Sequence, residues 1–333
     1  MDLGFWRQNW RCPLSEPDTG NLTRAKCYSD EVCCGERRVS FRRAVLATLV
    51  LILSANASAG AARRSVNSWM LGWEPARLVN GSPVLFKVKS AAPIESLSGK
   101  WFDHEVFFSL DSQTRVWYGL AGISLEIRAG KYPLTLTGRR NDQKEISFEK
   151  LIAVGKGRYR RIAVNVPKQF TEPNPEQLQE IKEEQALKKE VFSRMDRDRQ
   201  WAGGFIPAVS ASISDVFGTA RVFNGETQSM HQGVDYAVPS GTPVDALNRG
   251  TVLLARSLFF EGNCVVIDHG QGLLSLYMHL SKLEVKDGDS VAKGQEIGLS
   301  GGTGRATGPH LHVAVRWQGI YVNPATLMSL KLP

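Results

Sequence analysis

Five of the chain's six histidines fall between residues 231 and 312, and three of them lie in two short motifs with the residue types of a metal site. In the first motif His231 precedes Asp235 by four residues, and in the second His310 precedes His312 by two. A structural zinc site usually has four protein ligands, often including cysteine, whereas a catalytic zinc site has three and leaves one position for water. His231, Asp235 and His312 would supply three ligands, so these residue types favour hydrolysis.

The spacing of each motif limits the backbone that carries it. On a strand, His310 and His312 would point to the same face at about twice the ~3.3 Å rise, so one could bind a metal while its neighbour faced the metal's water. His231 and Asp235 would lie about 13 Å apart on a straight strand, and Gly233 between them disfavours a helix. We therefore expect a kinked strand or a turn that bends at Gly233. The helical H-E-x-x-H motif of zincins is absent.

Further motifs surround these two in a fixed order. They are Phe217-Gly218 with Arg221, Gly241-Thr242-Pro243-Val244, Gly250-Thr251-Val252, Asp268-His269-Gly270, Tyr277-Met278-His279-Leu280, Gly288-Asp289 with Val291 and Gly294, and Thr303-Gly304 before Gly308-Pro309-His310-Leu311-His312. In these motifs, the chain from about Phe217 to Pro324 resembles the LytM/lysostaphin-type zinc endopeptidases, which cut peptide cross-links in bacterial cell walls.

The resemblance implies a role for five residues. His231, Asp235 and His312 match the ligands of one zinc ion, and His279 and His310 match two catalytic histidines, of which either could be the general base. It also implies that residues 201–333 form an antiparallel β domain of the duplicated hybrid motif type, related to the barrel-sandwich hybrid. The alternating segment 273–279 is expected to be a strand that delivers His279 to the cleft.

The function implied is hydrolysis of peptidoglycan cross-links by a zinc-activated water. Glycine bridges and D-alanyl-diaminopimelate cross-links are both substrates within the family, and a domain layout like that of Gram-negative periplasmic proteins favours the second. Some LytM-type domains have lost zinc ligands and activate separate wall amidases; the complete set of five positions favours an enzyme. An enzyme held silent by a loop or by the N-terminal region is a further alternative.

A carrier module is a different hypothesis for the C-terminal region. Residues 241–252 and residues 288–298 resemble two copies of a hairpin unit, and similar units build lipoyl and biotinyl carriers. No lysine stands in the hairpin context that a carrier requires, and the clustered histidines would have no role. The sequence therefore favours the peptidase.

The start of the chain carries an export signal. A basic stretch at residues 37–43 precedes a run of about ten apolar residues from Ala44, and Ala57-Ser58-Ala59 offers a cleavage site. We expect residues 44–62 to be a signal peptide or an uncleaved anchor in the inner membrane. Either alternative implies that the protein acts outside the cytoplasm, as a periplasmic protein, a secreted protein or a protein anchored to the inner membrane. Residues 1–43 precede the signal as a polar extension, which an incorrectly assigned gene start would explain.

Cysteines and charge add little to this picture. Four of the five cysteines lie in the first 36 residues, so cleavage near Ala59 would leave only Cys264, which we expect to be a small buried apolar residue. The net charge of +8 suits an anionic wall or lipid surface, and it also suits an ordinary solvated surface. No segment resembles a nucleic-acid-binding module, and nothing predicts the oligomeric state.

The remaining sequence predicts a mainly β protein with a helical linker. Short strands separated by turn residues over residues 75–170 indicate an immunoglobulin-like β-sandwich. A helix is expected over residues 174–200, because Asn174 can cap it and Pro175 fits its first turn. Its apolar stripe is Leu187, Val191 and Met195. From residue 205 onward we expect strands and turns and no helix.

Overall fold

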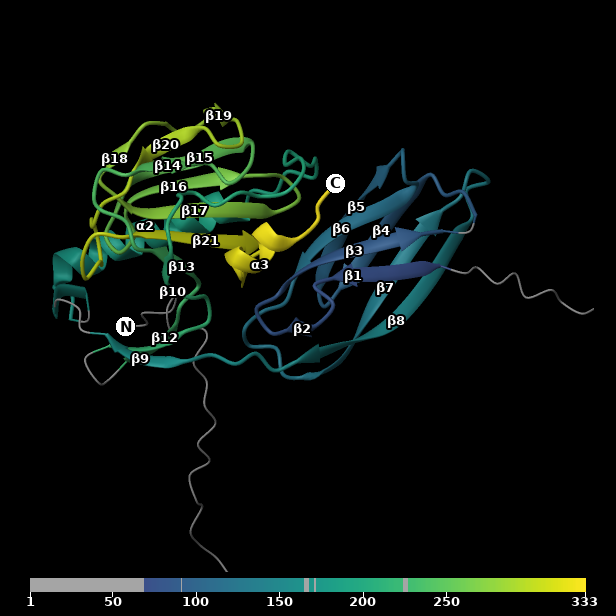
Figure 1. Cartoon of the computed structure of the whole chain (residues 1–333), viewed down its shortest axis with the longest axis horizontal. Coiled ribbons are helices and arrows are strands. Elements are labelled where there is room, and N and C mark those ends of the chain that lie inside the picture. The colour runs from purple at the N-terminus through teal and green to yellow at the C-terminus, as the bar shows by residue number, and fades with distance from the viewer. Residues whose placement is uncertain (1–68, 91, 165–167, 171, 224–226) are drawn as a thin grey trace, which may run out of the picture. The chain divides into compact units, whose positions relative to one another are not determined.

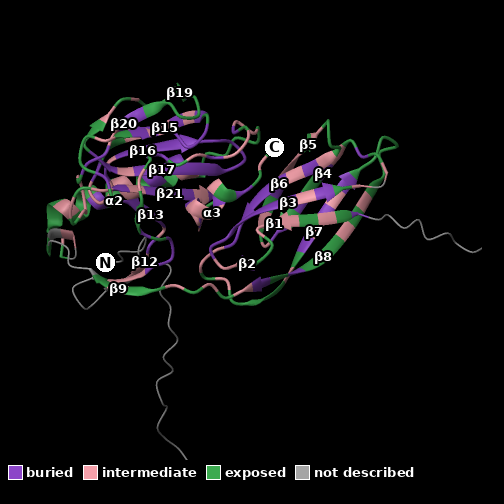
Figure 2. Ribbon diagram, viewed as in Figure 1, coloured by how far each residue is buried: buried purple, intermediate pink, exposed green. Residues whose placement is uncertain are grey.

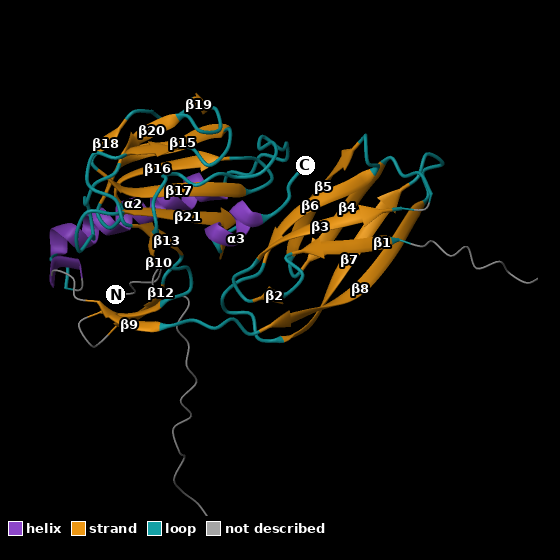
Figure 3. Ribbon diagram, in the orientation of Figure 1, coloured by secondary structure: helices purple, strands orange, loops and turns teal. Residues whose placement is uncertain are grey.

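The structure is a computed structural model, and it describes residues 69–333 except residues 91, 165–167, 171 and 224–226. The described part consists mainly of β-strands with few helices, as the sequence predicts (Figure 1 and Figure 3). The predicted extension at residues 1–43, the predicted signal at residues 44–62 and four of the five cysteines lie outside the described residues. Among the helices that the structure describes, none has the length and apolarity needed to span a bilayer.

The first eight strands follow one hydrogen-bonded path in the order β1-β3-β6-β5-β4-β7-β8-β2. Apolar and polar residues alternate in β4, where Leu97 and Trp101 are buried and Ser98 and Lys100 are exposed. The immunoglobulin-like assignment of this region stays a prediction. The strands are β1 (Met70–Glu74), β2 (Leu78–Val79), β3 (Pro83–Lys89), β4 (Ser96–Trp101), β5 (His104–Asp111), β6 (Val116–Gly122), β7 (Gly130–Arg139) and β8 (Glu145–Gly155).

A short strand and two helical segments follow this sheet. They are β9 (Arg161–Val164), the 3-10 helix η1 (Lys168–Phe170) and the α-helix α2 (Pro175–Ser193). Strand β9 lies near the end of the region 75–170 in which the sequence predicts short strands, and it pairs in parallel with β11 (Ala220–Phe223) instead of with β8. The segment that enters the helix is therefore attached to the strands that follow it.

Helix α2 begins where the sequence predicts and ends earlier. The side chain of Asn174 accepts a hydrogen bond from Gln177 N, and the Gln177 side chain accepts one from Asn174 N, which forms a capping box. The predicted extension toward residue 200 is wrong, because the helix stops at Ser193. Beyond it the Asp196 side chain accepts a hydrogen bond from Asp198 N, and this local turn competes with helix continuation.

The C-terminal strands form one large sheet and two small ones. The large sheet has the order β10-β13-β21-β17-β16-β15-β19, with β22 beside β21; the small sheets are β12-β11-β9 and β14-β20-β18. The strands are β10 (Ile213–Asp215), β11, β12 (Thr227–Met230), β13 (Gly233–Tyr236), β14 (Pro243–Asp245), β15 (Gly250–Leu258), β16 (Gly262–Asp268), β17 (Leu273–Leu280), β18 (Lys282–Leu283), β19 (Ser290–Val291), β20 (Glu296–Leu299), β21 (Leu311–Trp317) and β22 (Ile320–Val322).

Both faces of the central strands are covered. Figure 2 shows β16, β17 and β21 as largely buried, and even Ser275 and Tyr277 in β17 are fully buried. One covering layer comes from α2, whose Val191 packs with Leu254, Val266 and Leu276. Since β17 has no solvent-facing side, its alternating sequence does not by itself direct any residue toward a cleft.

A second α-helix near the C-terminus was missed by the sequence analysis. Helix α3 (Pro324–Ser329) begins at Asn323, whose side chain accepts hydrogen bonds from the backbone of Ala325 and Thr326. The expectation of no helix after residue 205 is therefore wrong. The signal was present, because Asn323-Pro324 repeats the Asn-Pro start that predicted α2.

A buried polar chain fixes the turn between β16 and β17. His269 is fully buried, its Nδ1 lies 2.8 Å from the carbonyl oxygen of Arg249, and its Nε2 lies 2.7 Å from Ser275 Oγ. Ser275 Oγ in turn lies 3.0 Å from the Tyr277 hydroxyl, which accepts a hydrogen bond from Leu247 N. Burial lowers the pKa of His269 to about 4, although the hydrogen bond to Arg249 acts in the opposite direction. This histidine is a neutral structural group.

The lowered pKa of His269 predicts a loss of stability in mild acid. The pKa of His269 is near ~6.5 in the unfolded chain and about 4 in the folded chain. The contribution of neutral His269 to the free energy of unfolding is therefore complete above pH ~6.5 and falls as the pH drops toward 4. At pH 5 the loss is about 2 kcal/mol from this residue. Between pH 7.5 and pH 5, the unfolding free energy of zinc-free wild-type protein should therefore fall by about 2 kcal/mol more than that of His269→Gln. Urea unfolding at both pH values measures it, and parallel losses would contradict it.

Candidate metal centre

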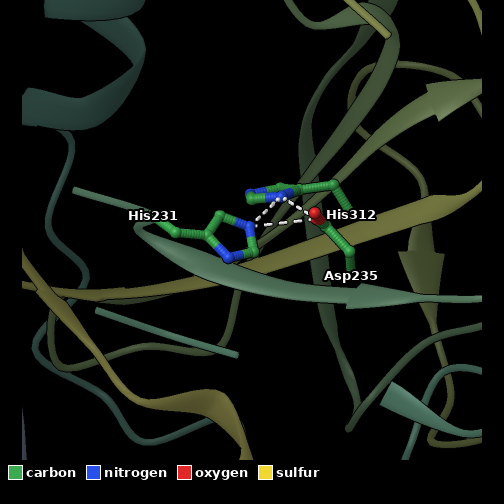
Figure 4. A group of neighbouring side chains, drawn as sticks. All are labelled: His231, Asp235 and His312. Carbon is green, nitrogen blue, oxygen red and sulfur yellow. Dashed lines mark hydrogen bonds and ion pairs between the residues drawn. The ribbon is translucent and has the colours of Figure 1, made fainter. Parts of the chain in front are cut away.

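Three side chains converge on one point in the large C-terminal sheet. His231 Nε2 lies 3.0 Å from Asp235 Oδ1 and 3.0 Å from His312 Nδ1, and the last two atoms are 2.7 Å apart (Figure 4). The side chains are 1%, 10% and 12% exposed, respectively. His231 and His312 are 81 positions apart in sequence, yet together with Asp235 they direct three potential ligand atoms to one point that is shielded from solvent.

Two neighbouring strands create this convergence. Strands β13 and β21 are antiparallel and place Asp235 directly opposite His312. His231 lies in the break between β12 and β13, two residues before Gly233, so His231 and Asp235 do not share one continuous strand. Gly233 does not have a positive φ. A Cβ atom on it would lie 2.4 Å from Val313 O and 2.6 Å from His312 Nε2, so glycine is required here for close approach.

The three side chains fit a divalent metal ion. Two imidazole nitrogens and one carboxylate oxygen form a ligand set used by catalytic zinc. Tetrahedral ligands at ~2.0–2.2 Å from zinc would be about 3.3 Å from one another, so the observed separations need to widen by only a few tenths of an ångström. Within the described residues this is the one group of histidine, cysteine and acidic side chains with metal-ligand spacing.

The far side of His231 is held by other groups. Its Nδ1 lies 3.0 Å from the carbonyl oxygen of Val216 and 3.2 Å from Asp215 Oδ2. An Nδ1–H that donates to these oxygens leaves the lone pair of Nε2 directed at the metal point. Burial would lower the pKa of His231, but the hydrogen bonds to Asp215 and Asp235 outweigh it and raise the pKa in the metal-free protein.

Asp235 is held in its ionised form. Burial by itself would raise its pKa, yet the hydrogen bonds from His231 and His312 hold the pKa well below the usual range. Its second oxygen, Oδ2, accepts a hydrogen bond of 2.5 Å from Arg221 Nη2. One carboxylate oxygen is therefore occupied by an arginine, and the other faces the two imidazoles.

Two further histidines border the metal point. The ring centroids of His279 and His310 are 4.8 Å apart, and His279 lies 6.2 Å from the ring of His312. His310 Nε2 is 4.0 Å from Asp235 Oδ1. Each donates through Nδ1 to a backbone carbonyl 2.8 Å away, at Thr303 and Gly308 respectively, which leaves Nε2 as the free ring nitrogen.

His279 reaches this place by leaving the regular strand geometry. Its φ is +64°, in the left-handed region that non-glycine residues rarely adopt. The strand predicted over residues 273–279 is confirmed as β17, and His279 borders the site as expected, but it does so where the backbone leaves the regular alternation. Backbone strain of this type is concentrated at functional sites. Burial, together with the nearby His312 and His310, lowers the pKa of His279 to about 3.

The structure therefore brings together all five residues that the sequence singled out. The sequence motifs did not predict a role for Arg221, Asp215 or Val216. Asp215 could have been found as a carboxylate in the otherwise uncharged stretch from Ile213 to Phe217. The backbone carbonyl of Val216 carries no sequence signal, because every residue has one.

Comparisons with known proteins agree on this part of the chain. Residues 229–324 match the sequence profile of the family described as Peptidase family M23. The chain is 47% identical over 103 residues to peptidoglycan DD-endopeptidase ShyA of Vibrio cholerae, covering 31% of this chain and 23% of that protein. It is 42% identical over 136 residues to the DD-carboxypeptidase/endopeptidase Mpg of Neisseria meningitidis, covering 40% of this chain and 31% of that protein. The matches thus span less than a third of either relative.

A solved structure extends the similarity beyond this segment. A crystal structure of a Pseudomonas aeruginosa protein assigned to peptidase M23 superposes with a TM-score of 0.59 at 29% identity. The match covers 76% of this chain and 95% of that one. The resemblance inferred from the sequence motifs is therefore confirmed.

Substitution of Gly233 tests the close approach of β13 to β21. In Gly233→Ala the new methyl group meets Val313 O and His312 Nε2, so the strands must separate. We expect a loss of about 1–3 kcal/mol in stability, together with weaker zinc binding, measured by thermal unfolding and by chelator competition. Gly72→Ala is the matched control, because Gly72 lies in β1 and its Cβ would meet no atom within 4 Å. Unchanged zinc affinity in Gly233→Ala would contradict this account of the glycine.

Proposed function

Residues 229–324 form a peptidase M23 domain, and from this premise we propose that the protein is a zinc-dependent endopeptidase that hydrolyses peptide cross-links of bacterial peptidoglycan. The observation that carries the proposal is the convergence of His231, Asp235 and His312 beside two further histidines with free Nε2 atoms. Three ligands leave a tetrahedral ion one position for reactants.

The proposed cofactor is one zinc ion per chain, with His231, Asp235 and His312 as its ligands. When bound, zinc polarises the scissile carbonyl group and lowers the pKa of a water molecule toward ~7. The ligand side chains are largely shielded from solvent, which strengthens electrostatic effects at the reacting atoms.

The proposed catalytic residues are His279 and His310. Their backbone hydrogen bonds occupy Nδ1 of both rings, and His310 Nε2 lies 4.0 Å from Asp235 Oδ1. One imidazole takes the proton of the attacking water and returns a proton to the leaving amine, and the other stabilises the oxyanion that forms on the substrate. Proton transfer of this kind contributes about 10²–10⁴-fold to the rate.

We propose the D-alanyl-diaminopimelate cross-link as the substrate bond. Two relatives with more than 40% identity over the matched region support this choice, since one is named a peptidoglycan DD-endopeptidase and the other a DD-carboxypeptidase/endopeptidase. The proposed site of action is outside the cytoplasm, in the periplasm or at the inner membrane through residues 44–62. In the proposed domain layout, residues 75–170 form an immunoglobulin-like domain and residues 201–333 form a peptidase domain of the duplicated hybrid motif type. The linker between them contains helix α2, which ends at Ser193.

Two histidine variants separate metal binding from catalysis. His231→Ala removes a ligand and is expected to lose zinc, whereas His310→Ala is expected to keep zinc and to lose roughly 10²–10⁴ in rate. Zinc content is measured by atomic absorption. Activity is measured by mass analysis of the muropeptides released from purified peptidoglycan, where cross-linked dimers should fall as monomers rise.

The control is His104→Ala, since His104 is the one histidine outside residues 231–312. A fully active His310→Ala protein would contradict the assignment of that histidine. Zinc-loaded wild-type protein that leaves the cross-links intact, yet stimulates a purified wall amidase, would instead identify a regulator.

A further inference from the structure

Asp215 lies directly behind the candidate metal centre and receives an unusual number of donors. Its Oδ1 accepts hydrogen bonds from Arg160 Nη2 at 2.6 Å, Thr219 Oγ1 at 2.8 Å and Val216 N at 3.0 Å. Its Oδ2 accepts one from Arg221 Nη2 at 2.6 Å and lies 3.2 Å from His231 Nδ1. The side chain is 10% exposed, so this carboxylate is fixed in position by its neighbours.

The network reaches two of the three ligand side chains. Asp215 contacts the imidazole of His231 on the edge opposite the metal point. Arg221 donates from the same Nη2 atom to Asp215 and to Asp235 Oδ2. A carboxylate behind a ligating histidine fixes its tautomer and ring orientation, and a partner on the second carboxylate oxygen fixes the other ligand. Asp215 and Arg221 thus hold one histidine and one carboxylate as a unit.

The third residue of this hydrogen-bonded network, after Asp215 and Arg221, is Arg160, which comes from a distant part of the sequence. It lies 55 residues before Asp215 and outside the segment that matches family M23. Its guanidinium also approaches Thr219 Oγ1 and the carbonyl oxygen of Ser214, both at 3.3 Å. The hydrogen bonds described for the Arg160 side chain thus go to Ser214, Asp215 and Thr219.

The backbone around Arg160 is attached to the same place. Ala220 N donates to Arg160 O, and β9, which begins at Arg161, pairs with β11. The backbone of His231 is hydrogen-bonded to the adjacent turn, because Gly218 N donates to His231 O and His231 N donates to Thr219 O. A short continuous path therefore runs from the segment before α2 to a metal-ligand residue.

We propose that Asp215 is the positioning residue of the metal centre, and that Arg160 makes the segment before α2 part of that centre by holding Asp215 in place. The proposal rests on the metal site of the proposed function and not on the reaction. Detachment of this segment lowers metal affinity, so the docking of β9 and the loading of the ion are coupled. By linkage, the ion also strengthens the docking.

Zinc affinity of the full-length protein tests the proposal without any assay of hydrolysis. The zinc dissociation constant is measured by competition with a chromophoric chelator. Asp215→Asn keeps the size of the side chain and removes its charge, and we expect zinc binding to weaken about 10–100-fold. Arg160→Ala acts through Asp215 and is expected to weaken it about three- to tenfold, with Arg160→Lys recovering part of the loss.

A matched control distinguishes positioning from general loss of an ion pair. Arg256 is 48% exposed and pairs with Asp287 at 3.0 Å, while Arg160 is 50% exposed. Arg256→Ala should leave zinc affinity unchanged. The visible spectrum of the cobalt-substituted protein gives a second measurement, and it should change in Asp215→Asn and not in Arg256→Ala, because it reports the orientation of the ligands.

The outcomes separate this proposal from the proposed function. Wild-type protein that binds no zinc would overturn both. Wild-type protein that binds zinc, with Asp215→Asn and Arg160→Ala within twofold of it and with unchanged cobalt spectra, would overturn the positioning role alone. If Asp215→Asn is too unstable to purify, the rise in melting temperature that zinc causes is compared between Arg160→Ala and Arg256→Ala. A smaller rise in Arg160→Ala supports the coupling, and an equal rise overturns it.

Discussion

The antiparallel pairing of β13 with β21 is the constraint on which the site depends. Its register places Asp235 opposite His312 and Gly233 opposite Ala314. A slip of one residue would turn every side chain of β13 to the other face of the sheet, and the carboxylate would then leave the two imidazoles. The register is secured because β21 also pairs with β17, where Met278 lies opposite His312. The ligand strand is thus paired on both sides.

The second requirement is electrostatic. Asp215 and Asp235 are both largely buried, and burying a carboxylate is costly unless a partner of opposite charge and hydrogen bonds accompany it. Burial raises the pKa of Asp215, but hydrogen bonds from His231, Arg160 and Arg221 outweigh this and hold it low. The arginines stabilise the two negative charges from behind, while one face of Asp235 stays directed at the imidazoles. The same groups that make burial tolerable also orient the ligands.

The candidate ligands could be predicted from sequence because their signal is local. Metal-ligating residue types recur at fixed short spacings, and the motifs around them carry a family resemblance. Helix α2 could be placed for the same reason, since Asn174 and Pro175 are adjacent. The mainly β character followed from alternating apolar residues and regularly spaced turns.

What the sequence could not supply depends on long-range packing. Helix α2 buries one face of β17 and the main core buries the other, and neither contact is local in sequence. The positive φ of His279 likewise depends on the folded structure around it. The pairing of β9 with β11 joins segments about 59 residues apart, so the local sequence around Arg161 carries no signal that predicts it. The contact of Arg160 with Asp215 follows from that pairing, which explains why the residues behind the ligands were missed while the ligands were found.

X-ray absorption spectroscopy at the zinc edge of stoichiometrically loaded protein tests the central claim most directly. Two imidazoles and one carboxylate with an open position predict a shell of nitrogen and oxygen donors at about 2.0–2.2 Å, with the outer-shell scattering of two imidazole rings and no sulfur at ~2.3 Å. His231→Ala should lose one imidazole contribution or the ion itself. A sulfur contribution, or a spectrum of wild-type protein without imidazole scattering, would contradict the account.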